Sequence, residues 1–228
     1  MNQPTDEPAP GAESHATDAL DAAAARGQAD VPDTSPALDA AAALQRAVEA
    51  CCAALTQVVD RDWSARADDL SWSVSQTVEH TASCLVGYAG QVVGQPATGW
   101  VVPEVPLEKD MTQPDVVRWL AGSGAILASV VRTTPAQARG FHPYGTSDPV
   151  GFACMGIVEA LVHTYDVMHT FDVAWTIPPD SAQLAVTRLF RDAPAGDPVE
   201  ILRWCAGRQP LRDLPRREKW RWDGTPLP

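Results

Sequence analysis

The feature that most constrains the fold is a helical repeat of apolar residues, which recurs in four long segments of the chain. In ALDAAAALQRAVEACCAALTQVV (37–59), for example, apolar side chains recur three or four positions apart, with polar side chains between them. This spacing places the apolar side chains on one face of an α-helix. Strand-like alternation does not extend for long anywhere in the chain, so the sequence predicts an all-α fold.

Local signals indicate where the second and third of these helices begin. The second is expected over 76–94, with Ser73 or Ser75 as its N-cap. Thr112 stands three residues before Asp115, which is the spacing of a capping box and predicts the start of the third helix.

The fourth segment, GFACMGIVEALVHTYDVMHTFDVAW (151–175), is the most apolar, and Pro178 and Pro179 are expected to end its helix. Four helices of this length with long connections indicate a four-helix bundle. Beyond it the sequence predicts two shorter helices and a Trp-rich tail that covers the core, in segments 181–193, 197–208 and 211–228 respectively.

Composition argues against several classes of protein. The 228 residues carry a net charge of −12, whereas nucleic-acid binding needs clustered Lys and Arg. No apolar run reaches the roughly 18 to 20 residues of a membrane span, and the N-terminus lacks the pattern of a signal peptide. The five cysteines form no CxxC pair and no disulfide-like framework. We therefore expect a reduced, cytoplasmic protein with neither nucleic acid nor membrane as a partner.

The first 35 residues differ from the rest of the chain. They contain seven acidic residues and one basic residue, no aromatic residue and few large aliphatic ones. Such a segment can bury little apolar surface to offset its chain entropy. We expect a disordered acidic tail over 1–35 and a folded helical domain over 36–228.

The fourth helix carries polar residues that are unfavourable to bury, and three of them share one stripe. Because successive residues of a helix are rotated by about 100°, Glu159, His163 and Asp166 face the same side, while His169 lies roughly 80° away from Glu159. A Glu and a His spaced i, i+4 can coordinate one metal ion together.

A third ligand would have to come from another helix, and His80 is the candidate because it is the only histidine of the second helix. His80, Glu159 and His163 would leave coordination positions open, as catalytic metal sites do. Zn²⁺ fits this ligand set, and Fe²⁺, Ni²⁺ and Mn²⁺ also remain candidates. The alternative is a structural bundle without metal, in which His80 and Glu159 satisfy one another.

Two segments together resemble a known family. LSWSVSQTVEHTASCLVGYAGQVVG has a Trp-Ser-Val lead-in to a helix with a central His, and GIVEALVHTYDVMHTFDVAW has an E-x3-H-x2-D pattern. They resemble the DinB-like superfamily, and in particular the metal-binding N-terminal domain of the mycothiol-dependent maleylpyruvate isomerases. The resemblance extends from about Pro36 to the C-terminus. It implies a four-helix bundle that binds a divalent metal, usually zinc, through His80, Glu159 and His163.

The same resemblance implies a use for the metal. Relatives use low-molecular-weight thiols such as mycothiol, whose sulfur an open-site zinc would hold as the nucleophilic thiolate for attack on an electrophilic substrate. Only about 50 residues follow the fourth helix, too few for the further domain of maleylpyruvate isomerases. We therefore expect a related thiol-dependent transferase or isomerase, with a small-molecule thiol and an electrophile as partners. The alternative is a non-catalytic metal-binding regulatory or interaction protein, and the sequence leaves a homodimer open.

Asp166 is the residue to which we assign a catalytic part, as an acceptor that supports the metal site or as a polar group at its mouth. Its alternative is a bond to Lys or Arg across the bundle.

Other residues carry weaker expectations. Cys84, four residues after His80, could approach the metal, although burial is the usual role of such a cysteine. Tyr88 could donate a hydrogen bond near the site, and His142 lies in a loop that could contact a substrate. Four tryptophans are expected to pack in the core or between helices: Trp63, Trp72, Trp119 and Trp204.

Overall fold

The structure is a computed structural model that describes residues 35–102 and 111–227. The acidic tail predicted over 1–35 therefore lies outside the described residues as far as Thr34. Within the described ranges the chain is helical, and its only β-type pairings are isolated bridges between single residues.

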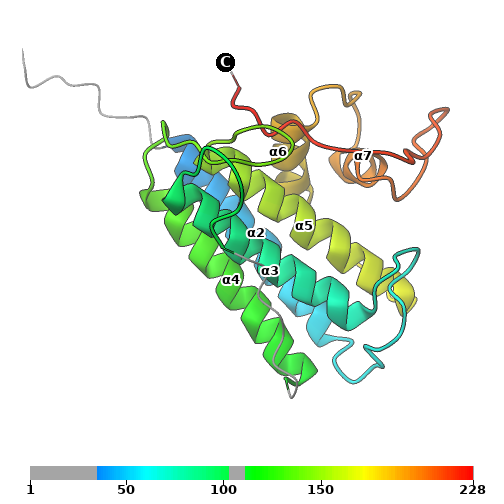
Figure 1. Ribbon diagram of the computed structural model, residues 1–228. Coiled ribbons are helices and arrows are strands. Elements are labelled where there is room, and N and C mark those ends of the chain that lie inside the picture. The colour runs from blue at the N-terminus through cyan, green and yellow to red at the C-terminus, as the bar shows by residue number, and fades with distance from the viewer. Residues whose placement is uncertain (1–34, 103–110, 228) are drawn as a thin grey trace, which may run out of the picture. The chain divides into compact units, whose positions relative to one another are not determined.

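Four long helices form a bundle, as predicted (Figure 1). They are α2 (Ser35–Thr56), α3 (Val74–Gly94), α4 (Gln113–Thr133) and α5 (Pro149–Thr170). Both α2 and α3 pack against α4 and against α5, so the apolar faces predicted from the helical repeat meet in one core.

The predicted capping residues begin the second and third helices of the bundle. The Ser73 hydroxyl accepts the backbone N–H of Gln76, whose side chain in turn accepts the N–H of Ser73. Thr112 and Asp115 make the same reciprocal pair at the start of α4. Each capping box satisfies two backbone donors that a helix start leaves without an intrahelical partner.

The predicted end of α5 is wrong, because the helix stops at Thr170 and not at Pro178. Asp172 adopts a left-handed conformation with φ of 55°. Its N–H donates to the carbonyl of His169, and the N–H of Val173 donates to the carbonyl of Met168. This is a Schellman ending, which closes the helix without the glycine that usually marks it in a sequence.

The C-terminal part of the chain packs on the bundle as two short helices and an extended segment. The helix α6 (Pro179–Leu189) contacts α5 and α2, and α7 (Pro198–Cys205) contacts α6. In the Trp-rich tail, Trp222 is buried, and the backbone N–H of Asp223 donates to the carbonyl of Leu189. The tail therefore covers the core, as predicted.

The helix α5 lies at the centre of this arrangement. Among the described residues it is the one helix long and apolar enough to cross a membrane, but 78% of that apolar window is buried inside the protein. A Cβ added at Gly156 would lie 2.8 Å from Leu85 of α3 and 2.9 Å from Leu127 of α4. This close approach brings the polar stripe of α5, one turn further along, within reach of α3.

Candidate metal centre

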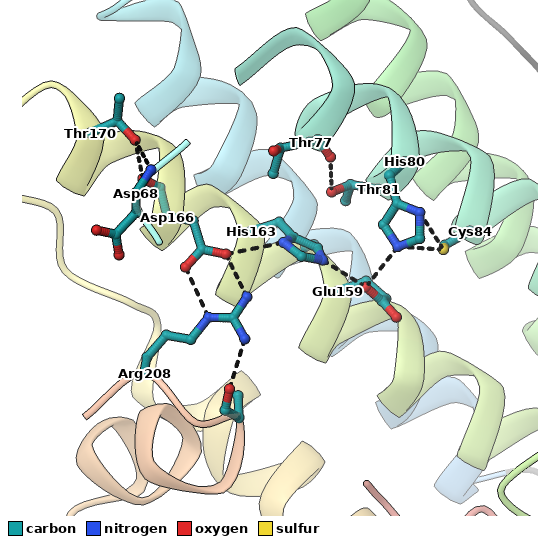
Figure 2. A network of polar contacts seen from close by, with 12 residues as sticks. Asp68, Thr77, His80, Thr81, Cys84, Glu159, His163, Asp166, Thr170 and Arg208 are labelled. Carbon is teal, nitrogen blue, oxygen red and sulfur yellow. Dashed lines mark hydrogen bonds and ion pairs between the residues drawn. The ribbon is translucent and has the colours of Figure 1, made fainter. Parts of the chain in front are cut away.

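Two helices of the bundle each contribute two polar side chains to a row between them (Figure 2). His80 and Cys84 project from α3, and Glu159 and His163 project from α5. Both pairs have the i, i+4 spacing that places side chains above one another on a helix face. The structure thus brings together the three residues that the sequence singled out, His80, Glu159 and His163.

The four side chains form a continuous row of short contacts. The Nε2 atom of His80 lies 3.4 Å from Cys84 Sγ and 3.7 Å from Glu159 Oε2. The same carboxylate oxygen lies 3.2 Å from His163 Nε2. The two imidazole rings stand edge to face, with their centroids 5.4 Å apart.

Three of the four donors lie close enough together to share a small divalent ion. Ligand atoms of His80, Cys84 and Glu159 all lie within 4.8 Å of one another. Zinc bonds of about 2.0–2.3 Å at tetrahedral angles place neighbouring ligand atoms about 3.3–3.6 Å apart, close to the contacts along the row. Imidazole, thiolate and carboxylate are also the donors that zinc takes in proteins.

Asp166 lies behind His163, away from Glu159, and it is buried with only 1% of its side chain exposed. Its Oδ2 atom is 3.1 Å from His163 Nδ1, and both carboxylate oxygens accept from the guanidinium of Arg208, at 2.9 and 2.6 Å. Asp166 therefore contacts both a candidate metal ligand, His163, and an arginine, Arg208. Because Asp166 holds the Nδ1 side of the ring, His163 presents Nε2 to Glu159.

The charges in the row stabilise one another. Burial by itself would raise the pKa of Glu159, but hydrogen bonds and charge from His163 and His80 outweigh it and hold this pKa well below its usual range. Burial would likewise lower the pKa of His163, but Asp166 and Glu159 flank the ring and raise it to about 9. Without an ion, the histidine is therefore protonated at neutral pH and donates to both carboxylates.

Tyr88 supports the second oxygen of Glu159, as its predicted hydrogen-bonding role requires. Its buried hydroxyl donates to Glu159 Oε1 at 3.1 Å. Burial, followed by the charge of Glu159, raises the pKa of this phenol well above its ordinary value, so it remains a donor. Glu159 is thereby oriented with Oε2 toward the two histidines.

Trp72 is 37% exposed, so of the two places expected for it, the core and the space between helices, it does not occupy the core. Its ring lies 4.6 Å from that of His80 and 6.1 Å from that of His163, measured between centroids. The turn before α3 holds it there, with the backbone N–H of Ala67 donating to the carbonyl of Trp72. Trp72 therefore covers the row on one side. Trp63 and Trp204 are buried and Trp119 is partly buried, as expected.

A pocket opens beside the row along α3. It has a volume of about 380 Å³, and most of its lining is apolar. Its walls come from α3 and from the segment around Trp100, and the lining residues are His80, Ser83, Cys84, Gly87, Tyr88, Trp100 and Val102. A small molecule bound there would lie against the exposed side of His80 and Cys84.

The remaining histidines among the described residues lie outside the row. His142 is 6% exposed and packs its ring against Tyr88 and Trp100, so it lies behind the pocket wall and does not offer the substrate contact expected of it. His169 is exposed and pairs with Asp68 at 3.0 Å.

Sequence reasoning missed three contributors to the site: Arg208, Trp100 and the exposed position of Trp72. Arg208 lies 42 residues beyond Asp166, in a segment with no helical register relative to α5. The Trp-Ser-Val lead-in did contain a signal for Trp72, because an apolar residue next to a helix cap is placed at the helix start.

Comparison with known proteins finds a family model that matches the centre of the chain. A family model described as the DinB superfamily matches residues 43–167, which include the row from His80 to Asp166 and exclude Arg208. Neither a curated protein nor a solved structure shows a significant match to the chain.

Proposed function

The chain belongs to the DinB superfamily, and on that premise we propose that it binds a divalent metal ion, zinc above all, and uses it with a low-molecular-weight thiol as a transferase or isomerase. The observation that carries this proposal is the convergence of His80, Glu159 and His163 next to an apolar pocket. These three residues would hold the ion. When bound, the ion would supply Lewis acidity that favours the thiolate form of the co-substrate.

The surrounding residues position the donors. Asp166 keeps the His163 ring oriented and is itself held by Arg208, so the catalytic part predicted for it is that of a positioning residue. Tyr88 does the same for Glu159. Partners that orient metal ligands in this way contribute about 10- to 100-fold to metal affinity or activity.

The pocket supplies a place for the second substrate. Its walls are mainly apolar and include the Trp100 and Tyr88 rings, so they favour a small electrophile with an apolar or unsaturated body and keep water from it. In the reaction class we propose, the thiol gives up its proton and its sulfur forms a bond to an electrophilic carbon. That carbon in turn loses either the π bond to its neighbour, which takes up a proton, or its bond to a leaving group. The resemblance to mycothiol-dependent maleylpyruvate isomerases supports mycothiol as the thiol and the cytoplasm as the location.

A non-catalytic metal-binding role is the second candidate, and limited access to the row favours it. The side chains of Glu159 and His163 are each only 12% exposed, whereas that of His80 is 29% exposed. In such a protein the ion would stabilise the contact between α3 and α5. The surface of the folded protein would then carry the regulatory or interaction role.

The first test is metal content. Protein purified without chelator and without a histidine tag is analysed by elemental mass spectrometry, alongside a Glu159→Ala/His163→Ala variant. We expect about one equivalent of zinc in the wild type and its loss in the variant. His169→Ala is the matched control, because His169 lies on the same helix outside the row. Absence of stoichiometric metal in the wild type, even after reconstitution, would contradict the proposal. The side chains of the row would then satisfy one another as ion pairs without a metal.

Turnover then separates the two candidates. The zinc-loaded protein is assayed with mycothiol and other small thiols against a panel of electrophiles, and His163→Ala is assayed in parallel. Thiol-dependent turnover that His163→Ala abolishes supports the enzyme. Stoichiometric metal with no turnover across the panel supports the non-catalytic role.

A further inference from the structure

We infer that Cys84 is a further ligand of the ion held by His80, Glu159 and His163, so that α3 and α5 each contribute an i, i+4 pair of donors. This inference deepens the proposed function and rests on it for the presence of an ion.

The position of the sulfur relative to His80 is the first support. Cys84 Sγ lies 3.4 Å from His80 Nε2 and 3.9 Å from His80 Nδ1, so it is closer to the nitrogen that pairs with Glu159 (Figure 2). A sulfur and a nitrogen bound to one tetrahedral zinc are about 3.6 Å apart. The thiol thus already lies at the separation that a shared ion requires.

The symmetry of the two helices is the second support. Along the row, the contacts from Cys84 to His80, from His80 to Glu159 and from Glu159 to His163 are 3.4, 3.7 and 3.2 Å. Each helix contributes one outer and one inner member of this row. Two pairs of donors on facing helices can surround one point, which is how bundles build metal sites in their cores.

The other cysteines show what a purely structural thiol looks like in this protein. Cys51, Cys154 and Cys205 have no exposed surface, and Cys51 Sγ donates to the backbone carbonyl of Ala160 at 3.3 Å. Cys84 instead is partly exposed, lines the pocket and lies among a histidine and a carboxylate. Its surroundings are those of a ligand and differ from those of the packed thiols.

A sulfur ligand has two consequences for the site. Thiolate favours zinc over harder ions such as Mg²⁺ and Mn²⁺, and the thiol proton is released to solvent when the ion binds. With four protein donors the tetrahedron is complete, so a substrate thiol would have to displace one donor or raise the coordination number. The role of Cys84 therefore bears on how open the ion is to substrate.

Cobalt substitution tests the inference directly, because thiolate bound to Co²⁺ gives a charge-transfer band in the near ultraviolet. Co²⁺ is titrated into the metal-free full-length chain without oxygen, and absorption is recorded in the near-ultraviolet and visible regions. We expect the wild type to show the charge-transfer band with visible tetrahedral bands at one equivalent. Cys84→Ser should lose the charge-transfer band entirely and keep cobalt-dependent visible bands.

Cys52→Ser is the matched control. Cys52 is also partly buried, but its sulfur lies 3.7 Å from the carbonyl of Val117, away from the row, so its spectrum should equal that of the wild type. Zinc affinity should fall in Cys84→Ser by at least the roughly 10-fold effect of losing an outer positioning partner. Circular dichroism of each variant checks that the bundle is retained, and a Cys84→Ala variant repeats the test with a different side chain.

The outcomes separate this inference from the proposed function. One equivalent of bound Co²⁺ without a charge-transfer band, or a band that survives in both Cys84 variants, overturns the Cys84 ligand and leaves the metal site standing. No Co²⁺ binding by the wild type overturns the proposed function and this inference with it.

Discussion

Each end of α5 has an aspartate paired with a buried arginine from the C-terminal part of the chain. The two ion pairs differ in the further contacts that they make. At the start of the helix Asp148 pairs with Arg188, and near its end Asp166 pairs with Arg208. The two arginine side chains are 4% and 9% exposed. Removing one partner from such a buried pair is strongly destabilising.

We call the pair at the start of α5 the closed pair, because its further contacts are with backbone groups. Arg188 donates to Asp148 Oδ1 at 2.9 Å and to the carbonyls of Thr225 and Gly224 at 3.0 and 3.3 Å. Asp148 also accepts the backbone N–H of Gly151 as the cap of the helix. The further contacts of both partners therefore end at backbone groups, and the pair joins the start of α5 to α6 and to the tail.

We call the pair at the end of α5 the continued pair, because its contacts lead on to further side chains. The carboxylate of Asp166 that accepts from Arg208 also holds His163, and from there the row leads through Glu159 to donors that line a pocket. A buried ion pair can thus contribute to a chemical site when one of its members also orients a titratable side chain, as Asp166 orients His163.

The largest effect is expected at the closed pair, from Arg188→Ala. The substitution leaves Asp148 and two carbonyls without their donor, so the free energy of unfolding should fall by about 3–5 kcal/mol, measured by urea denaturation. Metal content per folded molecule should not change. Arg191→Ala, which removes a more exposed arginine paired with Asp223, serves as control and should cost less than about 1 kcal/mol. If Arg188→Ala lost metal binding and kept its stability, the pair at the start of α5 would be the one that supports the metal site, and this would contradict the roles given to the two pairs.

The next largest effect is expected at the continued pair, from Asp166→Asn. The amide no longer holds the His163 Nδ1–H with a charge, so zinc affinity should weaken about 10- to 100-fold, measured by competition with a chromophoric chelator. The control is Asp172→Asn, the same change at an exposed position beyond the same helix end. Unaltered affinity in Asp166→Asn would show that the aspartate serves Arg208 alone.

The free energy of unfolding should depend on pH through His142, near the start of α5. The centroid of its ring lies 5.5 Å from that of Trp222. Burial lowers the pKa of His142 to about 4 from its ordinary 6.5, with the charge of Glu159 opposing the shift. The unfolded chain therefore binds a proton between pH 6.5 and 4 that the folded chain does not. This contribution to stability is complete above pH 6.5 and is lost as the pH falls toward 4.

His142→Asn removes this titration and keeps an acceptor for the backbone N–H of Tyr144. The slope of unfolding free energy against pH should decrease in that window by at most about 1.4 kcal/mol per pH unit. Chemical denaturation of metal-free protein at several pH values measures it. Equal slopes for both proteins would mean that His142 is protonated in the folded chain.

The smallest effect is expected from Ser73→Ala at the start of α3, which removes the capping hydroxyl two turns before His80. The unfolding free energy should fall by about 1 kcal/mol. Because the interior of α3 remains packed, metal stoichiometry should be unchanged. Ser75→Ala is the control, since Ser75 lies inside the helix and does not cap it. A loss of metal here would show that the row depends on the helix end.

Much of the fold was predictable because its signals are local. The apolar repeat predicted the four long helices, and Ser73 and Thr112 predicted two of their starts, since both patterns act within a few residues. The end of α5 was misplaced because its Schellman turn uses Asp172, which has a weaker preference than glycine for the left-handed conformation.

The sequence by itself determined that Glu159 and His163 share a helix face and that His80 is the one histidine of a second helix, because helix geometry follows from spacing alone. Only the tertiary structure decided that Cys84 and Tyr88 join them, that Arg208 holds Asp166 and that Trp72 covers the row while His142 is buried. Several of these contacts join residues far apart in the chain, such as Tyr88 with Glu159 and Arg208 with Asp166. Their distances depend on how the helices and the C-terminal tail pack, and no local pattern encodes that packing.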